Sequence, residues 1–388
     1  MRHSERPDGP SLPAFPVALL ALLALGAAAA GPTLAGAGNP NLSVIGQPRL
    51  ALTTAPDDPT HDRPAWDLGE TEFMLDDYLN PYVRGTLVLA YAADEGLGLE
   101  EGYVDVVRGL PGTLNLRLGQ WRTGFGKLNP AHPHALPFSE RFGVLAAYLP
   151  GDESLDETGL EASLRLPSPG ETSLVAAVDW LRGDTFRRGR EDSGLPGDPL
   201  ADTGDAAAAP RPAGLARLSL YAPLDERSGL EVGLSATEGT NNVAAGARTR
   251  VLGADAKAKL WRGEDAYLLV QAEALKLRRE DAGWDGAAYT RDVVEPWGWY
   301  AFADWNLSRR WNAGASYERF QADTTERPWN RSLGLFAGFA LMEETTALRL
   351  DWRREQAGAP AGESRPDAVD VVTLRVIWSM GPHKAHQF

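Results

Sequence analysis

Hydrophobic and polar residues alternate with a period of two along most of the chain beyond residue 39. In residues 114–119, for example, leucines hold positions 114, 116 and 118, while Asn115, Arg117 and Gly119 stand between them. Successive side chains of a strand point to opposite faces, so each such segment predicts a β-strand with one apolar and one polar face. Soluble β-sandwiches alternate in the same way, so alternation alone does not place the strands in a membrane. The pattern returns in residues 160–165, 230–235 and 348–353.

The connections between these strands alternate between short and long. Short turns are expected at residues 80–81, 110–112, 168–171, 224–228, 262–265, 308–310 and 342–344. Longer links are expected at residues 54–68, 94–98, 123–153, 183–212, 240–246, 279–295, 323–331 and 357–366. Short periplasmic turns and longer extracellular loops join the antiparallel strands of outer-membrane barrels in this order, whereas a sandwich has no reason to follow it.

The strand count gives the fold class. It comes to about sixteen strands of about ten residues each, which is long enough to cross a bilayer when tilted. We therefore predict an all-β protein, a transmembrane antiparallel up-and-down β-barrel with no plug domain. Aromatic residues near the predicted strand ends fit interfacial girdles, although core packing in a soluble protein is the alternative. These residues are Tyr91, Trp180, Tyr221, Trp261, Trp305, Trp311 and Trp352.

The N-terminus has the order of a secretory signal peptide. Arg2 and Arg6 precede an apolar run over residues 15–30, and an A-x-A cleavage pattern follows at residues 35–37. We expect residues 1–37 to be removed and residues 38–388 to form the barrel; an uncleaved membrane anchor is the alternative. Export and the C-terminal Phe388 indicate the bacterial outer membrane, with recognition of Phe388 by the barrel-assembly machinery and outer-membrane lipid around the barrel.

Composition narrows the classes of function. The formal charge of −15 and the pI near 4.9 argue against a nucleic-acid partner. The absence of cysteine excludes disulfides and thiolate metal sites. A mean hydropathy of −0.28 is unlike a helical membrane protein but fits a barrel, in which only every second strand residue faces lipid. No nucleophile elbow, phosphate loop or metalloprotease motif is present, so we expect no enzymatic activity.

Charged residues of both signs occupy the strand faces predicted to point inward. A hydrated lumen tolerates such a mixture and a dry core does not. Most of these charges can pair across strands and brace the wall, so they do not reveal an ion preference. The residues expected to face the lumen are Arg84, Glu101, Asp105, Glu161, Arg165, Lys257, Lys259, Arg349, Arg353 and Arg375.

Residues 123–153 follow the fifth predicted strand and form the third extracellular loop. This position resembles the general porins, in which the third loop folds into the barrel and narrows the pore. Gly124 and Gly126 permit a bend, prolines stiffen the path, and aromatic residues give the loop an apolar surface. We expect the constriction to be formed by Arg117, Arg122, Lys127, Asn129, His132, His134, Glu140 and Arg141.

Four of the six histidines occur in two pairs. His132 and His134 stand in the predicted third loop, and His383 and His386 stand in the C-terminal tail. Histidines at such spacings bind zinc when Asp or Glu completes the shell. A single site for all four is difficult, because the tail should be periplasmic and the loop enters from outside. A structural or pore-lining role is the competing interpretation.

Several segments resemble a bacterial family of porin-like barrel proteins, often labelled zinc-regulated TonB-dependent outer-membrane receptors. They are LGETEFML at residue 68, LEEGYVDV at residue 99, GQWRTGFGKLNPAHPHALPF at residue 119 and GPHKAHQF at residue 381. The resemblance covers the first third of the mature chain and its final residues. It implies a porin-like barrel and marks Asn129, His132 and His134 as the positions that carry the family pattern.

The function we expect is a passive diffusion channel for small hydrophilic solutes. An uptake protein or receptor for zinc or a metal chelate is the first alternative, and a structural or adhesive barrel that transports nothing is the second. No cofactor is required by the channel, while zinc would serve the first alternative. Porins of this size are often trimeric, so a homotrimer is the assembly to test.

Overall fold

The computed structural model describes residues 40–93, 96–151, 154–188, 209–342 and 346–381. The predicted signal peptide, at residues 1–37, lies outside the described residues. So do His383, His386 and Phe388, which carried the second histidine pair and the aromatic C-terminus. Among the described residues, no helix is long and apolar enough to cross a membrane.

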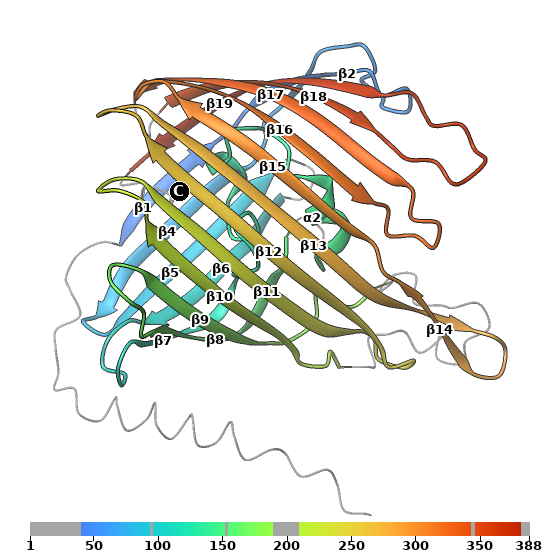
Figure 1. Cartoon of the computed structure of the whole chain (residues 1–388), viewed down its shortest axis with the longest axis horizontal. Helices are drawn as coiled ribbons and strands as arrows, with labels where there is room; N and C mark the ends of the chain where they lie inside the picture. The colour runs from blue at the N-terminus through green and yellow to red at the C-terminus, as the bar shows by residue number, and fades with distance from the viewer. Residues whose placement is uncertain (1–39, 94–95, 152–153, 189–208, 343–345, 382–388) are drawn as a thin grey trace, which may run out of the picture.

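In the described part of the chain, nineteen strands form one sheet in which every pairing is antiparallel and the last strand returns to the first (Figure 1). Three crossings of the barrel are each made of two consecutive strands, namely β1 with β2, β3 with β4, and β14 with β15. On one side β1 and β2 both pair with β19, and on the other β1 pairs with β4 and β2 with β3. In the same way β14 and β15 both pair with β13. Nineteen strands minus three such divisions leaves sixteen crossings. The predicted fold, a barrel of about sixteen strands without a plug, is confirmed.

The strands have the following bounds. They are β1 Asn41–Gly46, β2 Arg49–Thr53, β3 Ala65–Asp67, β4 Thr71–Asn80, β5 Val83–Ala92, β6 Gly96–Val106, β7 Leu114–Arg122, β8 Asp156–Leu166, β9 Ser173–Leu181, β10 Ala213–Pro223, β11 Gly229–Asn242, β12 Ala247–Trp261, β13 Tyr267–Trp284, β14 Tyr289–Val294, β15 Trp297–Asn306, β16 Trp311–Gln321, β17 Trp329–Met342, β18 Thr346–Gln356 and β19 Val369–Met380. One turn of 3₁₀ helix, η1 Pro133–Ala135, and one α-helix, α2 Gly143–Tyr148, lie between β7 and β8.

Large apolar side chains are exposed on the outer face of the barrel. Leu234 is 61% exposed and Leu350 is 51% exposed, although both stand in the middle of long paired strands. Leu118, Val178, Leu252 and Leu335 are exposed in the same way. A continuous apolar exterior of this kind is stable in lipid rather than in water, so the outward halves of the alternating strands form a membrane-facing surface.

Two details of the predicted strands differ. The link expected at residues 279–295 is mostly strand, because β13 continues to Trp284 and pairs with β14 beyond the barrel rim. Trp261, expected at an interface, instead packs on the ring of Tyr267 with a centroid distance of 4.9 Å, and the ammonium of Lys259 lies over it. Tyr91, Trp180, Tyr221, Trp305 and Trp311 are exposed near strand ends.

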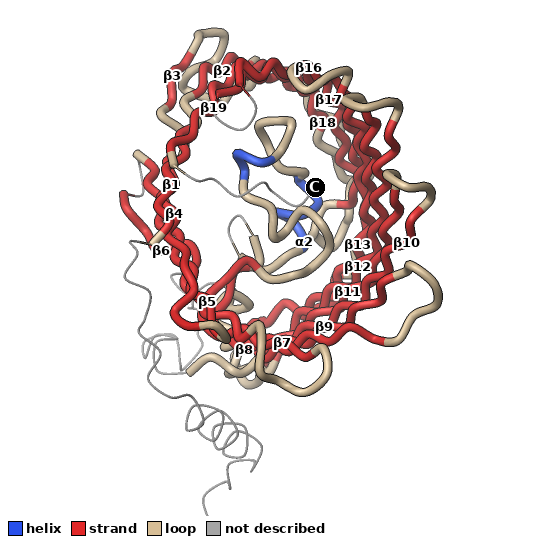
Figure 2. The backbone as a smooth tube through the Cα atoms, turned by 90° about the vertical axis from the view of Figure 1, so that its left-hand side faces the viewer, coloured by secondary structure: helices blue, strands red, loops and turns tan. Residues whose placement is uncertain are grey.

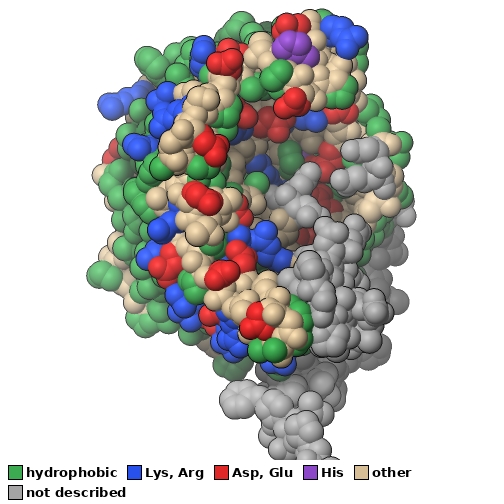
Figure 3. Space-filling model, turned by 90° about the vertical axis from the view of Figure 1, so that its right-hand side faces the viewer, with side chains coloured by type: hydrophobic (Ala, Val, Ile, Leu, Met, Phe, Trp, Pro, Cys, Tyr) green, Lys and Arg blue, Asp and Glu red, His purple; other side chains and the backbone are tan. Residues whose placement is uncertain are grey.

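The described part of the link between β7 and β8, residues 123–151 and 154–155, lies inside the barrel. Figure 2 shows this segment and its two short helices within the ring of strands. We call it the inner loop. The buried apolar cluster of the protein includes Phe125, Leu136, Phe142 and Leu145 of this loop, packed on inward-facing residues of the wall. At the end of the barrel with the longer links, a hollow rimmed by charged side chains leads toward the inside (Figure 3).

Candidate functional site: the inner loop and the spaces beside it

Hydrogen bonds hold the two ends of the inner loop together where it leaves the wall. The backbone N–H of Thr123 donates to the carbonyl of Leu155 at 2.9 Å. The side-chain amide of Asn129 donates to the carbonyls of Thr123 at 2.8 Å and Leu155 at 3.1 Å, and its oxygen accepts from the N–H of Leu155 at 2.8 Å. Asn129 is only 1% exposed. One amide therefore ties the first and last residues of the loop together.

A glycine is required where the loop first meets the opposite wall. Gly126 has a φ of +63°, and a Cβ at this position would lie 2.3 Å from a carboxylate oxygen of Glu273. Side chains other than that of glycine are strained at positive φ, and here they would also collide with the wall. Of the two glycines expected to permit the bend, Gly126 is the one with a left-handed backbone.

Arginines of the wall bind backbone carbonyls of the inner loop. Arg375 of β19 donates to the carbonyls of Pro133 at 3.0 Å, Leu136 at 3.0 Å and Phe138 at 2.9 Å. Arg349 of β18 donates to the carbonyls of His134, at 3.0 Å, and Leu136. Arg353 donates to the carbonyl of Arg141 at 2.9 Å. Apart from one turn of 3₁₀ helix and the short helix α2, the described part of the loop has no regular structure, so the wall supplies donors to these carbonyls.

Carboxylates of the wall bind backbone N–H groups of the same loop. Glu273 of β13 accepts from the N–H groups of Lys127 at 2.6 Å and Leu128 at 3.0 Å. Asp351 of β18 accepts from the N–H of Ser139 at 3.1 Å and from its hydroxyl at 2.5 Å. Glu318 of β16 accepts from the N–H of Val144 at 3.1 Å and from Arg353 at 2.5 Å. Donors and acceptors of the loop are thus fixed by buried charges on four wall strands.

Aromatic packing supports the same placement. Phe142 stacks on Tyr300 with ring centroids 4.0 Å apart and an interplanar angle of 15°. Phe138 meets Phe302 and Phe336 edge to face, at 5.3 Å and 5.7 Å. Contacts of this kind add to the free energy of burial, and they hold the middle of the loop against β15 and β17.

The first half of the inner loop carries two histidines into an acidic region of the wall. His134 Nδ1 lies 2.6 Å from an oxygen of Glu72, and His132 Nδ1 lies 3.1 Å from the other oxygen of Glu72. His132 also lies 3.6 Å from Glu100. Glu70 belongs to the same group, because Glu70, Glu72 and Glu100 bring carboxylate oxygens within 4.8 Å of one another. We call these five residues the carboxylate–histidine cluster.

The cluster fits a bound cation. Glu72, His132 and His134 each offer one ligand atom, and these atoms also lie within 4.8 Å of one another. One buried carboxylate oxygen each of Glu70 and Glu100 has no hydrogen-bond partner among the described residues. Burial alone would lower the pKa of the His132 imidazole, but Glu72, Glu100 and Glu101 raise it well above its ordinary value. Imidazole and carboxylate donors at these distances are a zinc-type ligand set.

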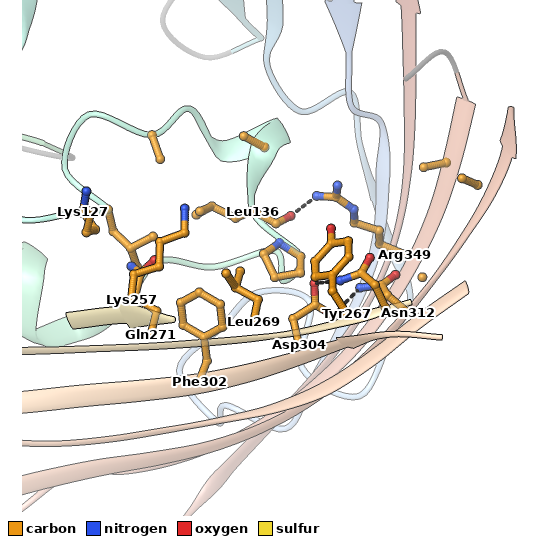
Figure 4. A pocket seen from close by; sticks show the side chains of 18 of the residues that line it. Lys127, Leu136, Lys257, Tyr267, Leu269, Gln271, Phe302, Asp304, Asn312 and Arg349 are labelled. Carbon is orange, nitrogen blue, oxygen red and sulfur yellow. Dashed lines mark hydrogen bonds between the residues drawn. The ribbon is translucent and has the colours of Figure 1, made fainter. Parts of the chain in front are cut away.

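A cavity of about 560 Å³ lies on the other side of the inner loop, toward the short turns. The loop contributes Lys127, Leu136 and neighbouring residues. The short-turn halves of β13 and β15–β18, the turn between β15 and β16, Arg217 of β10 and Lys257 of β12 contribute the rest. In Figure 4, Lys127, Lys257 and Arg349 reach toward this space, while Phe302 and Leu269 line its floor. We call it the vestibule.

The eight residues predicted to form the constriction are distributed unevenly. Lys127 lines the vestibule and forms an ion pair with Glu231. Arg122 is 4% exposed, pairs with Glu100 and donates to the carbonyl of Ala131. His132 and His134 belong to the cluster, and Arg141 donates to the carbonyl of Ala131. Glu140 is exposed and pairs with Arg49 at 2.9 Å. Arg117 remains on the wall, paired with Asp105 at 2.8 Å.

The prediction that Asn129, Arg122 and His134 line a constriction is therefore corrected. All three side chains are buried and bonded within the loop or to the wall, so a passing solute does not meet them. The reason is that these three side chains form hydrogen bonds with polar groups of the loop and the wall, which leaves them buried and unavailable to line the pore.

The predicted lumen-facing residues make two kinds of contact. Arg349, Arg353 and Arg375 anchor the inner loop, as described, and Glu101 accepts from the N–H of Arg122 at 3.0 Å. The others lie along the wall. Arg84 pairs with Asp76, and Asp105 and Glu161 each stand in register with Arg117. Lys257 lines the vestibule, and the ammonium of Lys259 lies over the rings of Trp261 and Tyr267. Arg165 is exposed near the end of β8.

Several important residues were not assigned to a site from the sequence. Glu72 and Glu100 complete the cluster, and Glu273, Glu318 and Asp351 hold the inner loop. The E-x-E pattern at Glu70 and Glu72 was the available signal for the cluster. It could not be connected with residue 132 without knowing where the inner loop lies.

Comparison with known proteins supports the fold. No protein-family model matches the chain. An uncharacterised protein of Aquifex aeolicus is 27% identical over 354 residues, which cover 84% of this chain and 71% of that protein. The outer-membrane channel DcaP of Acinetobacter baumannii matches with a TM-score of 0.57 at 10% identity, over 88% of this chain and 96% of that one. An anion-selective porin from Comamonas acidovorans matches with a TM-score of 0.54 at 12% identity, over 87% and 98%.

These matches establish a fold of the outer-membrane porin type. The part of the resemblance that concerns a porin-like barrel is confirmed. The TonB-dependent receptor label finds no support, because such a receptor has a barrel of about 22 strands with a plugged lumen, whereas this barrel has sixteen crossings.

Proposed function

We propose that this protein is an outer-membrane channel for the passive diffusion of small hydrophilic solutes. The observation that carries the proposal is the vestibule, a cavity of about 560 Å³ with charged walls inside a closed barrel whose exterior is apolar. Charged side chains lining the interior of a membrane barrel are stable when water fills it. The inner loop, in which charged side chains of the wall bind nine backbone groups, sets the width of the path. In this proposal the protein carries out no chemical reaction on the solute.

Planar-bilayer recording with purified, refolded protein tests this proposal. Stepwise openings that scale with salt concentration are the expected result, and detergent carried through the same purification is the control. A variant with Phe142→Ala removes the stacking on Tyr300 and should make the current noisier by loosening the loop. Absence of openings from correctly folded protein would contradict the channel and favour a structural or adhesive barrel.

We propose a second function for the carboxylate–histidine cluster, namely capture of zinc or a related divalent cation at the inner loop. The arrangement of Glu72, His132 and His134 favours it, with Glu70 and Glu100 close by. Calorimetric titration of zinc into the purified barrel is the direct test. The variant with His132→Ala and His134→Ala should lose binding, whereas His61→Ala, an exposed histidine in a long link, should retain it. Equal binding by both variants would reject the site.

Assembly is a further part of the proposal. We propose a homotrimer in the outer membrane, inserted through recognition of Phe388 by the barrel-assembly machinery. Chemical cross-linking in native membranes should give a trimer band, and deletion of Phe388 should reduce the amount of folded, heat-modifiable barrel. A monomer band alone, with normal insertion of the truncated chain, would contradict both statements.

A further inference from the structure

A row of side chains crosses the outer face of the barrel near the end with the longer links. Arg319 of β16 is directly opposite Arg331 of β17, and we call these two residues the arginine pair. Trp299 of β15 flanks Arg319 in this row, and Gln356 of β18 flanks Arg331. Both arginines are exposed, whereas Ser332 beside Arg331 is buried toward the interior. Two cationic side chains therefore stand next to each other on the outward side of the wall.

Neither member of the arginine pair has a carboxylate partner among the described residues. The guanidinium of Arg319 lies over the ring of Trp329 at 4.5 Å, and Arg331 donates to the side-chain oxygen of Gln356 at 2.7 Å. Both of these partners are uncharged. Like charges directly opposite each other destabilise a sheet. The described part of the chain therefore leaves two adjacent positive charges that it does not neutralise.

The carboxylates beside the arginine pair either lie apart from it or bind other cations. Glu326, Glu363 and Asp367 lie in the described links next to β16, β17 and β18 and form no ion pair with either arginine. Three others have partners of their own: Asp323 binds Arg279 at 2.5 Å, Glu355 binds Arg353 at 2.9 Å, and Asp370 pairs with Arg354 at 3.6 Å. Within the described ranges, a counter-charge for the arginine pair must come from outside the chain.

Two other opposed arginines on the same outer face are neutralised by the chain itself. Arg250 of β12 is directly opposite Arg278 of β13. Here Glu238 binds Arg250, and Glu295 binds Arg278 at 2.8 Å. The barrel thus supplies carboxylates to these two arginines, and its described residues supply none to the arginine pair on β16 and β17.

The arginine pair lies at the edge of the apolar exterior. Toward the short turns, the same face of β17 continues with Leu333, which is 43% exposed, and Leu335, which is 52% exposed. Toward the longer links, Trp297 and Trp329 meet edge to face with ring centroids 5.2 Å apart. Tryptophan rings and outward-facing charges are both stable at the level of the lipid headgroups. The arginine pair therefore faces headgroups rather than acyl chains.

We propose that the arginine pair binds the phosphate group of an anionic membrane lipid in the leaflet at the long-link end. A guanidinium donates two parallel hydrogen bonds to phosphate oxygens, so two adjacent guanidiniums can hold one phosphate group between them. Basic side chains beside a bilayer surface attract anionic headgroups. Leu333 and Leu335 offer an apolar surface to the acyl chains of such a lipid, which free phosphate lacks. The inference does not depend on whether the barrel conducts.

Native mass spectrometry of the purified barrel tests the inference. It counts the lipids that stay bound in detergent that contains equal amounts of phosphatidylglycerol and phosphatidylcholine. The wild type should retain phosphatidylglycerol preferentially, and an excess of inorganic phosphate should not displace it. The variant with Arg319→Gln and Arg331→Gln should bind phosphatidylglycerol about ten-fold more weakly, because it loses both charged groups. Arg331→Lys keeps the charge without the bidentate geometry, so its loss should be smaller.

The matched control is the variant with Arg227→Gln and Arg262→Gln, which removes two exposed arginines at the short-turn end. Arg227 also lies over a tryptophan ring, that of Trp261, at 4.1 Å. This control should keep the wild-type lipid preference. Heat modifiability on gels establishes that each variant is folded, and Arg331→Gln alone carries the test if the double variant does not fold. Wild-type binding after loss of the arginine pair, an equal loss in the control, or displacement of the lipid by inorganic phosphate would overturn the inference.

Discussion

The inner loop separates two polar regions that use the same residue types in opposite ways. On the side of β4 and β6, the carboxylate–histidine cluster is compact and rich in carboxylates, with Glu72 and His134 buried and the other three residues partly buried. Toward the short turns, the vestibule is open and larger, and lysines and arginines outnumber carboxylates among the described residues that line it. The cluster gathers ligand atoms within coordination distance of one another, whereas the vestibule spreads its charges around a space. The first arrangement suits one dehydrated cation, and the second suits mobile hydrated solutes.

Two arginines of the wall also separate two roles, anchoring of the inner loop and selection of solutes in the vestibule. Arg375 and Arg349 are both arginines of the wall that bind the inner loop, but Arg349 also lines the vestibule. Arg375 is buried and has no contact with that space. A variant that disturbs only anchoring should therefore change stability and loop noise, and one that disturbs only the vestibule should change selectivity.

Arg375→Met should have the largest effect on the fold. The change leaves the carbonyls of Pro133, Leu136 and Phe138 without this donor. We expect the free energy of unfolding to fall by about 3 kcal/mol or more, because each buried carbonyl loses a charged hydrogen bond. Urea unfolding in detergent, followed by tryptophan fluorescence, measures it. Arg250→Met, at an exposed ion pair, should cost about 0–1 kcal/mol; equal losses would mean that the loop is not anchored through Arg375.

Asn129→Ala should have the next largest effect. It removes the amide that joins both ends of the inner loop and leaves the N–H of Leu155 without its partner. The expected loss is about 2 kcal/mol of unfolding free energy, from buried groups left unsatisfied. Zinc affinity and ion selectivity of the folded protein should change little. A large change in either with unchanged stability would show that Asn129 meets the solute, as the sequence first indicated.

Glu72→Gln should weaken zinc binding by about ten-fold, or about 1.4 kcal/mol, since the amide keeps the shape of the side chain and removes its charge. Glu72 contacts both histidines, at 2.6 Å and 3.1 Å, so its charge lies at the centre of the cluster. Calorimetry measures the affinity. Glu161→Gln, a carboxylate on the wall outside the cluster, is the matched control and should bind zinc like the wild type. Unchanged affinity in Glu72→Gln would remove Glu72 from the ligand set.

The smallest effect should be that of a vestibule variant on zinc binding by the carboxylate–histidine cluster. Lys257→Glu alters the vestibule, and its effect on zinc affinity should be less than about two-fold because screening weakens charge interactions beyond about 10 Å in salt. Titration of zinc into this variant and the wild type gives the comparison. A change as large as that caused by Glu72→Gln would mean that the cluster and the vestibule form one site.

The sequence by itself determined the barrel. Alternation at Leu114, Leu116 and Leu118, repeated along the chain, fixes which face of each strand is apolar, and the short and long links fix an up-and-down order. Both patterns are local, because each depends only on residues that are close together in the sequence. The same reasoning placed residues 123–153 after the fifth strand, and the structure has β7 as the fifth crossing. It also marked His132 and His134 as a pair.

Only the tertiary structure decided what those residues do. Glu72 and His134 are 62 positions apart, and Arg375 and Leu136 are 239 positions apart, so no local pattern connects them. The described part of the inner loop has little regular structure beyond η1 and α2, so many of its backbone groups form hydrogen bonds with wall charges that lie within reach. This arrangement buries Arg122, Asn129 and His134, which the sequence had offered to the solute, and leaves Lys127 with Lys257 at the vestibule. The strand pattern is set by local alternation, whereas the site is set by closure of the barrel around its own loop.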